Sequence, residues 1–273
     1  MEKNTLLLIK IGGGADINWD YIADDLASMN EPYILVHGAN STMTQISQSL
    51  QKEERTIQSP SGFSSRYSDK ETIDVFLQAY CGLANKRLVE LLQRKGIKAV
   101  GLSGIDGGIW TGKKKAKIIG TPSDEQKVRV IRDNYVGNVT QINTELLTLL
   151  LSHDYVPVLT APAISLGGEI INVDNDRAVA TMVKELNIKE VVMLFGAPGL
   201  LRDHLDETSV IPHLTVNELE QSMEFAKGRM KKKVLGTQEA FKNGLETMYW
   251  GDGRIKNPIS STRAGIGTQI TQS

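Results

Sequence analysis

The chain has 273 residues, enough for one large domain or two fused lobes, and its 31 basic and 32 acidic residues leave a net charge of −1. This balance argues against a general attraction to nucleic acid or to a membrane surface. The single cysteine, Cys81, excludes an internal disulfide framework and predicts a buried structural thiol in a reducing cytoplasm. The sequence shows neither a signal-peptide pattern nor an apolar run near the ~20 residues of a membrane helix.

Strand and helix signals alternate along the chain. A short apolar run that ends in Lys10, Ile11 and glycines predicts a buried first strand, and apolar residues at helical spacing follow it. The expected elements are a strand at 5–11, a helix at 19–29, a strand at 33–36, a helix at 43–50, a loop at 59–65, a long helix at 68–95, a strand at 99–102, short hairpin strands within 107–133, a helix at 143–151, strands at 156–159 and 170–173, a helix at 176–186, a strand at 191–194, a helical region from 215 and a last strand at 247–250.

Capping residues mark the starts of several expected helices. Ser68 with Glu71 and Thr215 with Glu218 form capping-box patterns, and Asn143 is typical of an N-cap. The alternation of strands and helices predicts an α/β fold, a three-layer αβα sandwich with a central, mainly parallel sheet. Ligands of such sheets bind beyond the carboxyl ends of the strands, so the loops that follow the strands are the expected place for a site.

Two strand ends run into turns of small residues. Gly12, Gly13 and Gly14 follow Lys10 at the end of the first strand, and Gly38-Ala39-Asn40 follows His37 at the end of the second. Backbone N–H groups in such turns can bind an anion, with the lysine adding a full positive charge. The lysine precedes its glycines, so the motif is not a P-loop, and a plain strand-to-loop turn explains it about as well. We interpret His37 as structural rather than as a general base.

Two further polar stretches are candidates for ligand binding. Arg66 could hold a carboxylate through two parallel hydrogen bonds, or it could pair with Asp69 or Glu71 at the helix start. The stretch 172–176 places four polar side chains in five positions, more than capping requires. Carboxylates there could orient lysines or lie near Mg²⁺, although the pattern is not that of an EF-hand.

Two basic runs also stand out. The run 228–233 contains Lys231, Lys232 and Lys233 at an expected helix start, where the helix dipole disfavours cations. A solvated charged face is the ordinary explanation, but a bound anion would make the placement easier to understand. The second run, Lys113-Lys114-Lys115 with Lys117, predicts an exposed hairpin that is either solvated or a docking patch.

Taken in order, these stretches resemble the amino acid kinase family over nearly the whole chain. Within that family the chain resembles the acetylglutamate kinase branch, and it is similar to the LysW-aminoadipate kinases of bacterial lysine biosynthesis at 80–92, 228–231 and 257–259. The blocks that carry the family resemblance are Lys10-Ile11-Gly12-Gly13, His37-Gly38, Arg66-Tyr67-Ser68-Asp69, Leu83-Ala84-Asn85-Lys86, Gly101-Leu102-Ser103-Gly104, 172–176, Pro198-Gly199 and 230–233.

The resemblance implies a carbamate kinase-like fold and phosphorylation of a side-chain carboxylate by ATP and Mg²⁺. It implies that Lys10 and Lys233 contact the transferring phosphoryl group from opposite sides and that Asp176 holds both lysines. No protein side chain is assigned as a metal ligand. The other implied site residues are Gly12, Gly13, Gly38, Ala39 and Asn40 for the phosphoryl group and the substrate carboxylate, Arg66 and Asn172 for the α-carboxylate and N-acyl group, and Phe195, Gly196, Pro198 and Gly199 for ATP.

The resemblance also implies an organisation and partners. Residues 1–176 would form the lobe for the amino acid substrate and for dimerisation, and residues 177–273 the nucleotide lobe, with one continuous sheet. A homodimer would form through the region 68–96. The expected partner is an acidic, LysW-like amino-group carrier protein that bears 2-aminoadipate or glutamate, with the lysines at 113–117 suited to steering it.

Three positions depart from the family pattern. Ala39 and Asn40 stand where the second turn usually has further glycines. The nucleotide strand ends in Phe195-Gly196-Ala197, where a small polar residue, an acid or amide, and valine are usual. Arg229 replaces the glycine of many acetylglutamate kinases, which favours the carrier-protein branch.

Three alternatives remain at the level of the sequence. The first is an acetylglutamate kinase of arginine biosynthesis that acts on free N-acetylglutamate. The second, suggested by the altered 195–199 segment, is a regulator that binds amino acids or nucleotides without catalysis. A dinucleotide-dependent dehydrogenase is the weakest, because no acidic residue follows a fitting glycine-rich turn.

Overall fold

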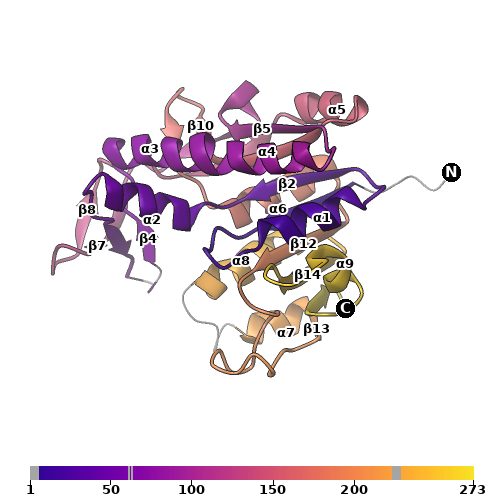
Figure 1. The fold of residues 1–273 in the computed structure, drawn as a ribbon. Helices are drawn as coiled ribbons and strands as arrows, with labels where there is room; N and C mark the ends of the chain where they lie inside the picture. The colour runs from indigo at the N-terminus through magenta and orange to yellow at the C-terminus, as the bar shows by residue number, and fades with distance from the viewer. Residues whose placement is uncertain (1–5, 61, 63, 223–228) are drawn as a thin grey trace.

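The computed structural model describes residues 6–60, 62, 64–222 and 229–273, and the α/β fold class predicted from the sequence is confirmed. A central sheet made largely of parallel strand pairs is flanked by helices (Figure 1). Its strands, in spatial order, are β13 (His213–Thr215), β15 (Thr268–Thr271), β14 (Thr247–Asp252), β12 (Glu190–Phe195), β1 (Leu7–Ile11), β2 (Tyr33–His37), β10 (Val156–Ser165), β6 (Trp110–Lys114) and β9 (Gly137–Ile142), with β5 (Ala99–Gly104) and β11 (Ile170–Ile171) also paired to β10.

Side chains on β1 alternate between two cores. Leu7, Ile9 and Ile11 point toward one helical layer, whereas Leu8 points toward the other, as the two-residue period of a strand requires. Lys10 therefore shares the face of Leu8. Helices α1 (Trp19–Ala27), α4 (Asn85–Arg94) and α9 (Pro258–Arg263) cover the first face, and α5 (Thr144–Ser152), α6 (Asn175–Leu186), α7 (Val216–Gln221) and α8 (Arg229–Lys242) contribute to the core on the other.

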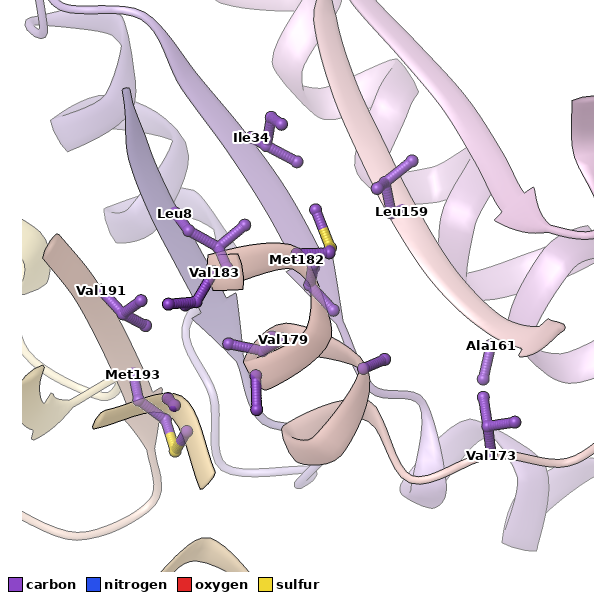
Figure 2. Close-up of a cluster of buried hydrophobic side chains, with 14 of the residues drawn as sticks. Leu8, Ile34, Leu159, Ala161, Val173, Val179, Met182, Val183, Val191 and Met193 are labelled. Carbon is purple, nitrogen blue, oxygen red and sulfur yellow. The ribbon is translucent and has the colours of Figure 1, made fainter. Parts of the chain in front are cut away.

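Helix α6 packs against the middle of the sheet. Figure 2 shows Val179, Met182 and Val183 of this helix among side chains of the central strands, including Leu8 and Val191. The side chain of Asp174 caps the helix by accepting from the N–H of Asp176, and Asn187 ends it in the left-handed region. The cap fixes the start of α6, and thereby places Asp176 beside the carboxyl end of the central strand β1.

A smaller antiparallel sheet lies beside the end of the main one and is formed by β4 (Ser64–Arg66), β3 (Thr56–Gln58), β7 (Ile118–Pro122) and β8 (Arg129–Ile131). The expected hairpin layer at 107–133 is thus divided. Its first strand, β6, joins the main sheet, and only β7 and β8 form a hairpin of the smaller one. Helix α2 (Asn40–Ser49) and the segment that begins with α3 (Lys70–Phe76) lie nearby (Figure 1).

Further local details differ from the sequence expectations. The capping box of Ser68 and Glu71 is wrong, because Asp69 is the N-cap and accepts from the N–H of Thr72. The long helix expected at 68–95 contains a π-helical stretch, η1 (Leu77–Ala84), between α3 and α4. A strand after 250, β15, was not expected. The Thr215–Glu218 capping box and the Asn143 cap are confirmed.

Cys81 lies within the π-helical stretch and is half-buried. Its Sγ donates to the carbonyl of Ala161 at 3.8 Å, and burial raises the pKa of the thiol to about 11. Such a thiol is unreactive at neutral pH, in line with a structural role. Among the helices in the described parts of the chain, none is long and apolar enough to cross a bilayer.

Candidate active site

The carboxyl ends of three neighbouring parallel strands define the candidate site. The register pairs Ile11 with His37 on β2 and with Leu194 on β12, so the turns after these strands start at one level. The chain runs from β1 to β2 on one side, and β12 returns much later to the other side of β1. A crevice at such a change of direction is the usual ligand position in open α/β sheets.

The turns after β1 and β2 contact each other through their backbones. A Cβ on Gly13 would lie 2.5 Å from the nitrogen of Ala39, and a Cβ on Gly38 would lie 2.9 Å from the nitrogen of Gly13. Only glycine permits this approach at the two positions. The N–H of Ser41 donates to the carbonyl of Gly13, which fastens the start of α2 to the first turn.

Two of the backbone donors predicted for the anion site have partners within the sheet. The N–H of Gly12 donates to the carbonyl of Leu194 at 2.8 Å, and that of Gly38 donates to the carbonyl of Ile11 at 2.9 Å. Among the described residues, the N–H groups of Gly13 and Ala39 have no such partner. Ala39 is the N-cap of α2 and Gly13 packs against it, so both N–H groups lie where the helix N-terminus adds positive potential. A groove of about 560 Å³ opens beside these turns.

A buried ion cluster lies next to the turns. Lys10 Nζ is 2.5 Å from Asp176 Oδ1, and Lys233 Nζ is 3.7 Å from Asp176 Oδ2. The Lys10 and Asp176 residues are only 5% and 8% exposed. The sheet, α6 and α8 each contribute one member, so three segments far apart in the sequence meet at one carboxylate.

Burial and mutual attraction set the charges of this cluster. Burial opposes ionisation of Asp176, but Lys10 and Lys233 outweigh it and lower the pKa of the carboxyl to about 2. Burial likewise opposes protonation of Lys10, yet the Asp176 carboxylate reverses the effect and leaves the pKa of Lys10 raised. For Lys233 burial prevails, and its pKa is lowered to about 8. One carboxylate thus serves two ammonium groups, so these three groups together carry a net positive charge, and Asp174 lies near them as a further acidic group whose pKa is raised by burial.

Lys233 accounts for the basic run at the start of α8. Besides Asp176, its ammonium group lies over the ring of Phe195, 5.0 Å from the centroid, a favourable arrangement for a cation. Of the run, Gly228 lies outside the described residues, and Lys231 and Lys232 are half-buried. The unfavourable placement of Lys233 near the N-terminus of α8 is offset here by a specific buried anion.

His37 is held as a neutral imidazole. Burial lowers its pKa to about 4, and the side-chain amide of Asn85 donates to Nε2 at 3.0 Å. Its carbonyl accepts from Thr160 and Asn175, which ties β2 to β10 and to the start of α6. These contacts agree with the structural interpretation of this histidine.

The predicted substrate residues Arg66 and Asn172 meet at Ser68. The Asn172 amide donates to Ser68 Oγ at 2.9 Å, and Ser68 Oγ donates to the carbonyl of Arg66 at 3.2 Å. The guanidinium of Arg66 pairs with Glu54 at 2.6 Å, rather than with Asp69 or Glu71 as one sequence interpretation had it. Both residues of this ion pair line a pocket of about 240 Å³.

The 195–199 segment follows β12 directly. Phe195 packs edge-on against Trp250 of β14, with ring centroids 6.0 Å apart. Gly196, which follows it, has the carboxylate of Asp16 against its Cα. Farther along, the N–H of Leu200 bonds to the hydroxyl of Thr268, which anchors the segment after Pro198 and Gly199 to β15.

The lysines at 113–117 differ in their surroundings. Lys114 pairs with Glu169 at 2.6 Å and stacks on Tyr135, whereas Lys113 and Lys117 are exposed. Burial, followed by the charges of Arg177 and Lys232, lowers the pKa of Lys115. Arg177 at the start of α6 and Lys232 of α8 are thus among the positive charges that act on Lys115.

This α/β fold brings two lysines onto one buried carboxylate. Residues 5–249 match the model of the amino acid kinase family, and the chain belongs to that family. A [LysW]-aminoadipate kinase of Deinococcus radiodurans is 43% identical over 97% of this chain and 91% of the relative. One from Thermus thermophilus is 38% identical over 97% of this chain and 100% of the relative.

Solved structures with lower identity share the fold. The N-acetylglutamate synthase of Neisseria gonorrhoeae superposes with a TM-score of 0.78 at 20% identity, over 99% of this chain. This chain spans 60% of that synthase. The carbamate kinase of Giardia superposes with a TM-score of 0.67 at 11% identity, over the whole of both chains.

Several residues at the site were not singled out from the sequence. Thr160 stands in an ordinary strand pattern, so nothing marks it as a residue that ties down β2. Asn85 belongs to a block that carries the family resemblance, but its hydrogen bond to His37 was not predicted. Asp16 lies in an irregular loop, and its signal is indirect. Glycines at 14 and 196 leave room that a neighbouring side chain can fill.

Proposed function

We propose that this protein is an ATP-dependent kinase that phosphorylates the side-chain carboxylate of 2-aminoadipate, or of glutamate, attached to an acidic LysW-like carrier protein. The observation that carries the proposal is the buried Asp176 carboxylate shared by Lys10 and Lys233 beside two backbone-to-backbone turns. The names of the relatives at 43% and 38% identity support the choice of acceptor.

The reaction would form a bond between a carboxylate oxygen and the γ-phosphorus while the bond to ADP breaks. A carboxylate is already ionised at neutral pH, so no general base is required, which suits a site whose histidine is locked as a structural group. Phosphoryl transfer asks the protein to position the reactants and to neutralise charge on the equatorial oxygens. Lys10 and Lys233 would neutralise this charge from two sides, and their ion pairs with Asp176 would fix their positions.

The backbone turns would complete the phosphoryl site. The N–H groups of Gly13, Ala39 and Asn40 would donate to the phosphoryl group and to the substrate carboxylate, while the missing side chains of Gly13 and Gly38 allow the two turns to approach closely. Mg²⁺ bound with ATP would neutralise further charge on the triphosphate. Among the described residues, no group of three or more acidic, histidine or cysteine side chains is arranged to hold a metal ion alone.

The substrate would enter from the side of Arg66 and Asn172. Arg66 would exchange its ion pair with Glu54 for the α-carboxylate, and Asn172 would bind the amide that links the amino acid to the carrier. Arg177 and Lys232 add to the positive charge around Lys115. An acidic carrier docked on these lysines would present its amino acid toward the ion cluster.

The remaining organisation follows the same proposal. Residues 1–176 would bind the amino acid, and residues 177–273 would bind ATP through Phe195, Gly196, Pro198 and Gly199. A cytoplasmic homodimer would form through the region 68–96, where Leu83 is 45% exposed. The sheet runs through both lobes.

The test is an acyl-phosphate assay with hydroxylamine as the trap. The purified protein with Mg-ATP is given carrier-linked 2-aminoadipate, carrier-linked glutamate or free N-acetylglutamate, and hydroxamate formation is measured. The proposal expects hydroxamate from a carrier-linked substrate at a rate far above that from N-acetylglutamate. A preference for N-acetylglutamate would identify an acetylglutamate kinase instead, and ligand binding without hydroxamate in any arm would identify a non-catalytic regulator.

A further inference from the structure

The loop after β1 places an acidic side chain against two separate glycine turns. A Cβ built on Gly14 would lie 2.4 Å from Asp16 Oδ1, and one built on Gly196 would lie 1.7 Å from Asp16 Oδ2. The carboxylate of Asp16 therefore occupies the space that a side chain on residue 196 would need. Asp16 belongs to the loop after β1, and its carboxylate reaches the end of the neighbouring strand β12.

The surroundings of this carboxylate belong to the proposed phosphate site. Gly14 continues the turn that begins at Gly13, and Gly196 directly follows Phe195, whose ring lies under the Lys233 ammonium group. Asp16 itself is exposed, and among the residues that the structure describes its carboxylate has no hydrogen-bond or ion-pair partner. An unpaired anion is thus held by backbone contacts beside a site made for a triphosphate.

Two anions side by side repel each other unless a cation lies between them. Mg²⁺ is usually held by one or two carboxylates together with substrate phosphates, and it keeps several waters. A single carboxylate next to the triphosphate fits this requirement, whereas a complete protein cage is absent among the described residues. We propose that Asp16 binds the Mg²⁺ of the nucleotide, directly or through a water of the ion. Its carboxylate would take the place of the acid or amide side chain that is usual at position 196 and that Gly196 lacks. This inference rests on the proposed kinase function.

The experiment measures nucleotide binding rather than turnover. The affinity for a non-hydrolysable ATP analogue is determined by calorimetry with saturating Mg²⁺ and again with EDTA, for the unchanged protein and for Asp16→Asn. We expect ~10-fold weaker binding of the Mg²⁺ complex by the variant, the order of loss seen when a metal site is perturbed. Binding without metal should stay equal or become tighter, because the variant removes a negative charge.

A matched control and an exchange sharpen the test. Asp20→Asn removes an exposed carboxylate from the first turn of α1 and should leave both affinities unchanged. Gly196→Asp alone should weaken Mg²⁺-nucleotide binding, because its Cβ overlaps Asp16. The double variant Asp16→Gly, Gly196→Asp should bind the Mg²⁺-nucleotide more tightly than Gly196→Asp does. On a logarithmic scale of affinity it should recover at least half of what Gly196→Asp loses. Circular dichroism and thermal unfolding establish that each variant is folded.

Distinct results would overturn the inference. An equal loss with and without Mg²⁺ would mean that Asp16 contacts the nucleotide itself, and no loss at all would mean that the carboxylate is merely solvated. A combined variant no better than Gly196→Asp would refute the exchange of roles. Absence of nucleotide binding by the unchanged protein would instead contradict the proposed function, and this inference with it.

Discussion

Asp176→Asn isolates the charge of the buried cluster without changing its shape. The pKa of Asp176 is about 2 in the folded protein against an ordinary value of 3.8. At about 1.4 kcal/mol per pKa unit, ionisation contributes roughly 2 kcal/mol to the free energy of unfolding at neutral pH. Because the folded pKa is the lower one, this contribution is complete above pH ~4 and is lost as the pH falls toward 2.

The asparagine variant lacks the contribution at every pH. Urea unfolding should therefore show a difference of roughly 2 kcal/mol between the two proteins at pH 7, shrinking as the pH is lowered from 4 to 2.5. Asp174→Asn is the matched control. Burial and the neighbouring Asp176 raise the pKa of Asp174, and asparagine also caps helices, so little stability should be lost. A difference for Asp176→Asn that stays constant from pH 7 to 2.5 would refute this reasoning.

The same variant separates binding from turnover. Without Asp176, the two lysines lose the anion that competes with the triphosphate, so ATP should bind at least as tightly as before. Turnover in the hydroxamate assay should fall by ~10²–10³, because the lysines are no longer held in the geometry that favours the transition state. Weaker ATP binding with unchanged turnover would show that Asp176 has no such positioning role.

Three other predictions concern the lysines and the first turn. Lys10→Ala and Lys233→Ala should each lower turnover by ~10²–10³ in a folded protein, as circular dichroism can verify, and near-normal rates in both would contradict the mechanism. Because burial lowers the pKa of Lys233 to about 8, ATP binding near pH 8 should take up protons. Calorimetry in buffers of different ionisation enthalpy measures this uptake, which should vanish in Lys233→Met. Gly13→Ala should cost ~1–3 kcal/mol of stability and weaken ATP binding, because its Cβ would lie 2.5 Å from the nitrogen of Ala39. Gly82→Ala, whose Cβ meets only Leu77 O at 3.7 Å, is the control that should be tolerated.

The central strands could be predicted because burial on both faces leaves an unbroken apolar run. This holds for the strands around Ile9 and Val192, and their parallel pairing followed from the alternation with helices. Strand β15 has one apolar residue, Ile270, among three polar ones and pairs through tertiary context, so no hydrophobic pattern marks it as a strand. The π-helical stretch at Leu77–Ala84 is likewise invisible to a helical period.

The candidate site could be predicted only in pieces. Lys10 and its glycines were recognisable as an anion-binding turn. Lys233 lies far away in the sequence, so no local pattern predicts that the two lysines share Asp176. That pairing came from the family resemblance and not from spacing. The Ser68–Glu71 spacing matches a capping box and so predicted Ser68 as the cap. Aspartate is also a good N-cap residue, and the folded helix start uses Asp69. The position of the Asp16 carboxylate could not be predicted, because the sequence does not show that Gly14 and Gly196 lie close together.

The aligned ends of β1, β2 and β12 limit which insertions and deletions these strands can tolerate. Because Ile11 lies level with both His37 and Leu194, deleting one residue from any of these strands would move its turn by ~3.3 Å and reverse the face of every side chain beyond the deletion. Lys10 would then point into the opposite core. The shared level of the three turns therefore requires that each of these strands keep its length.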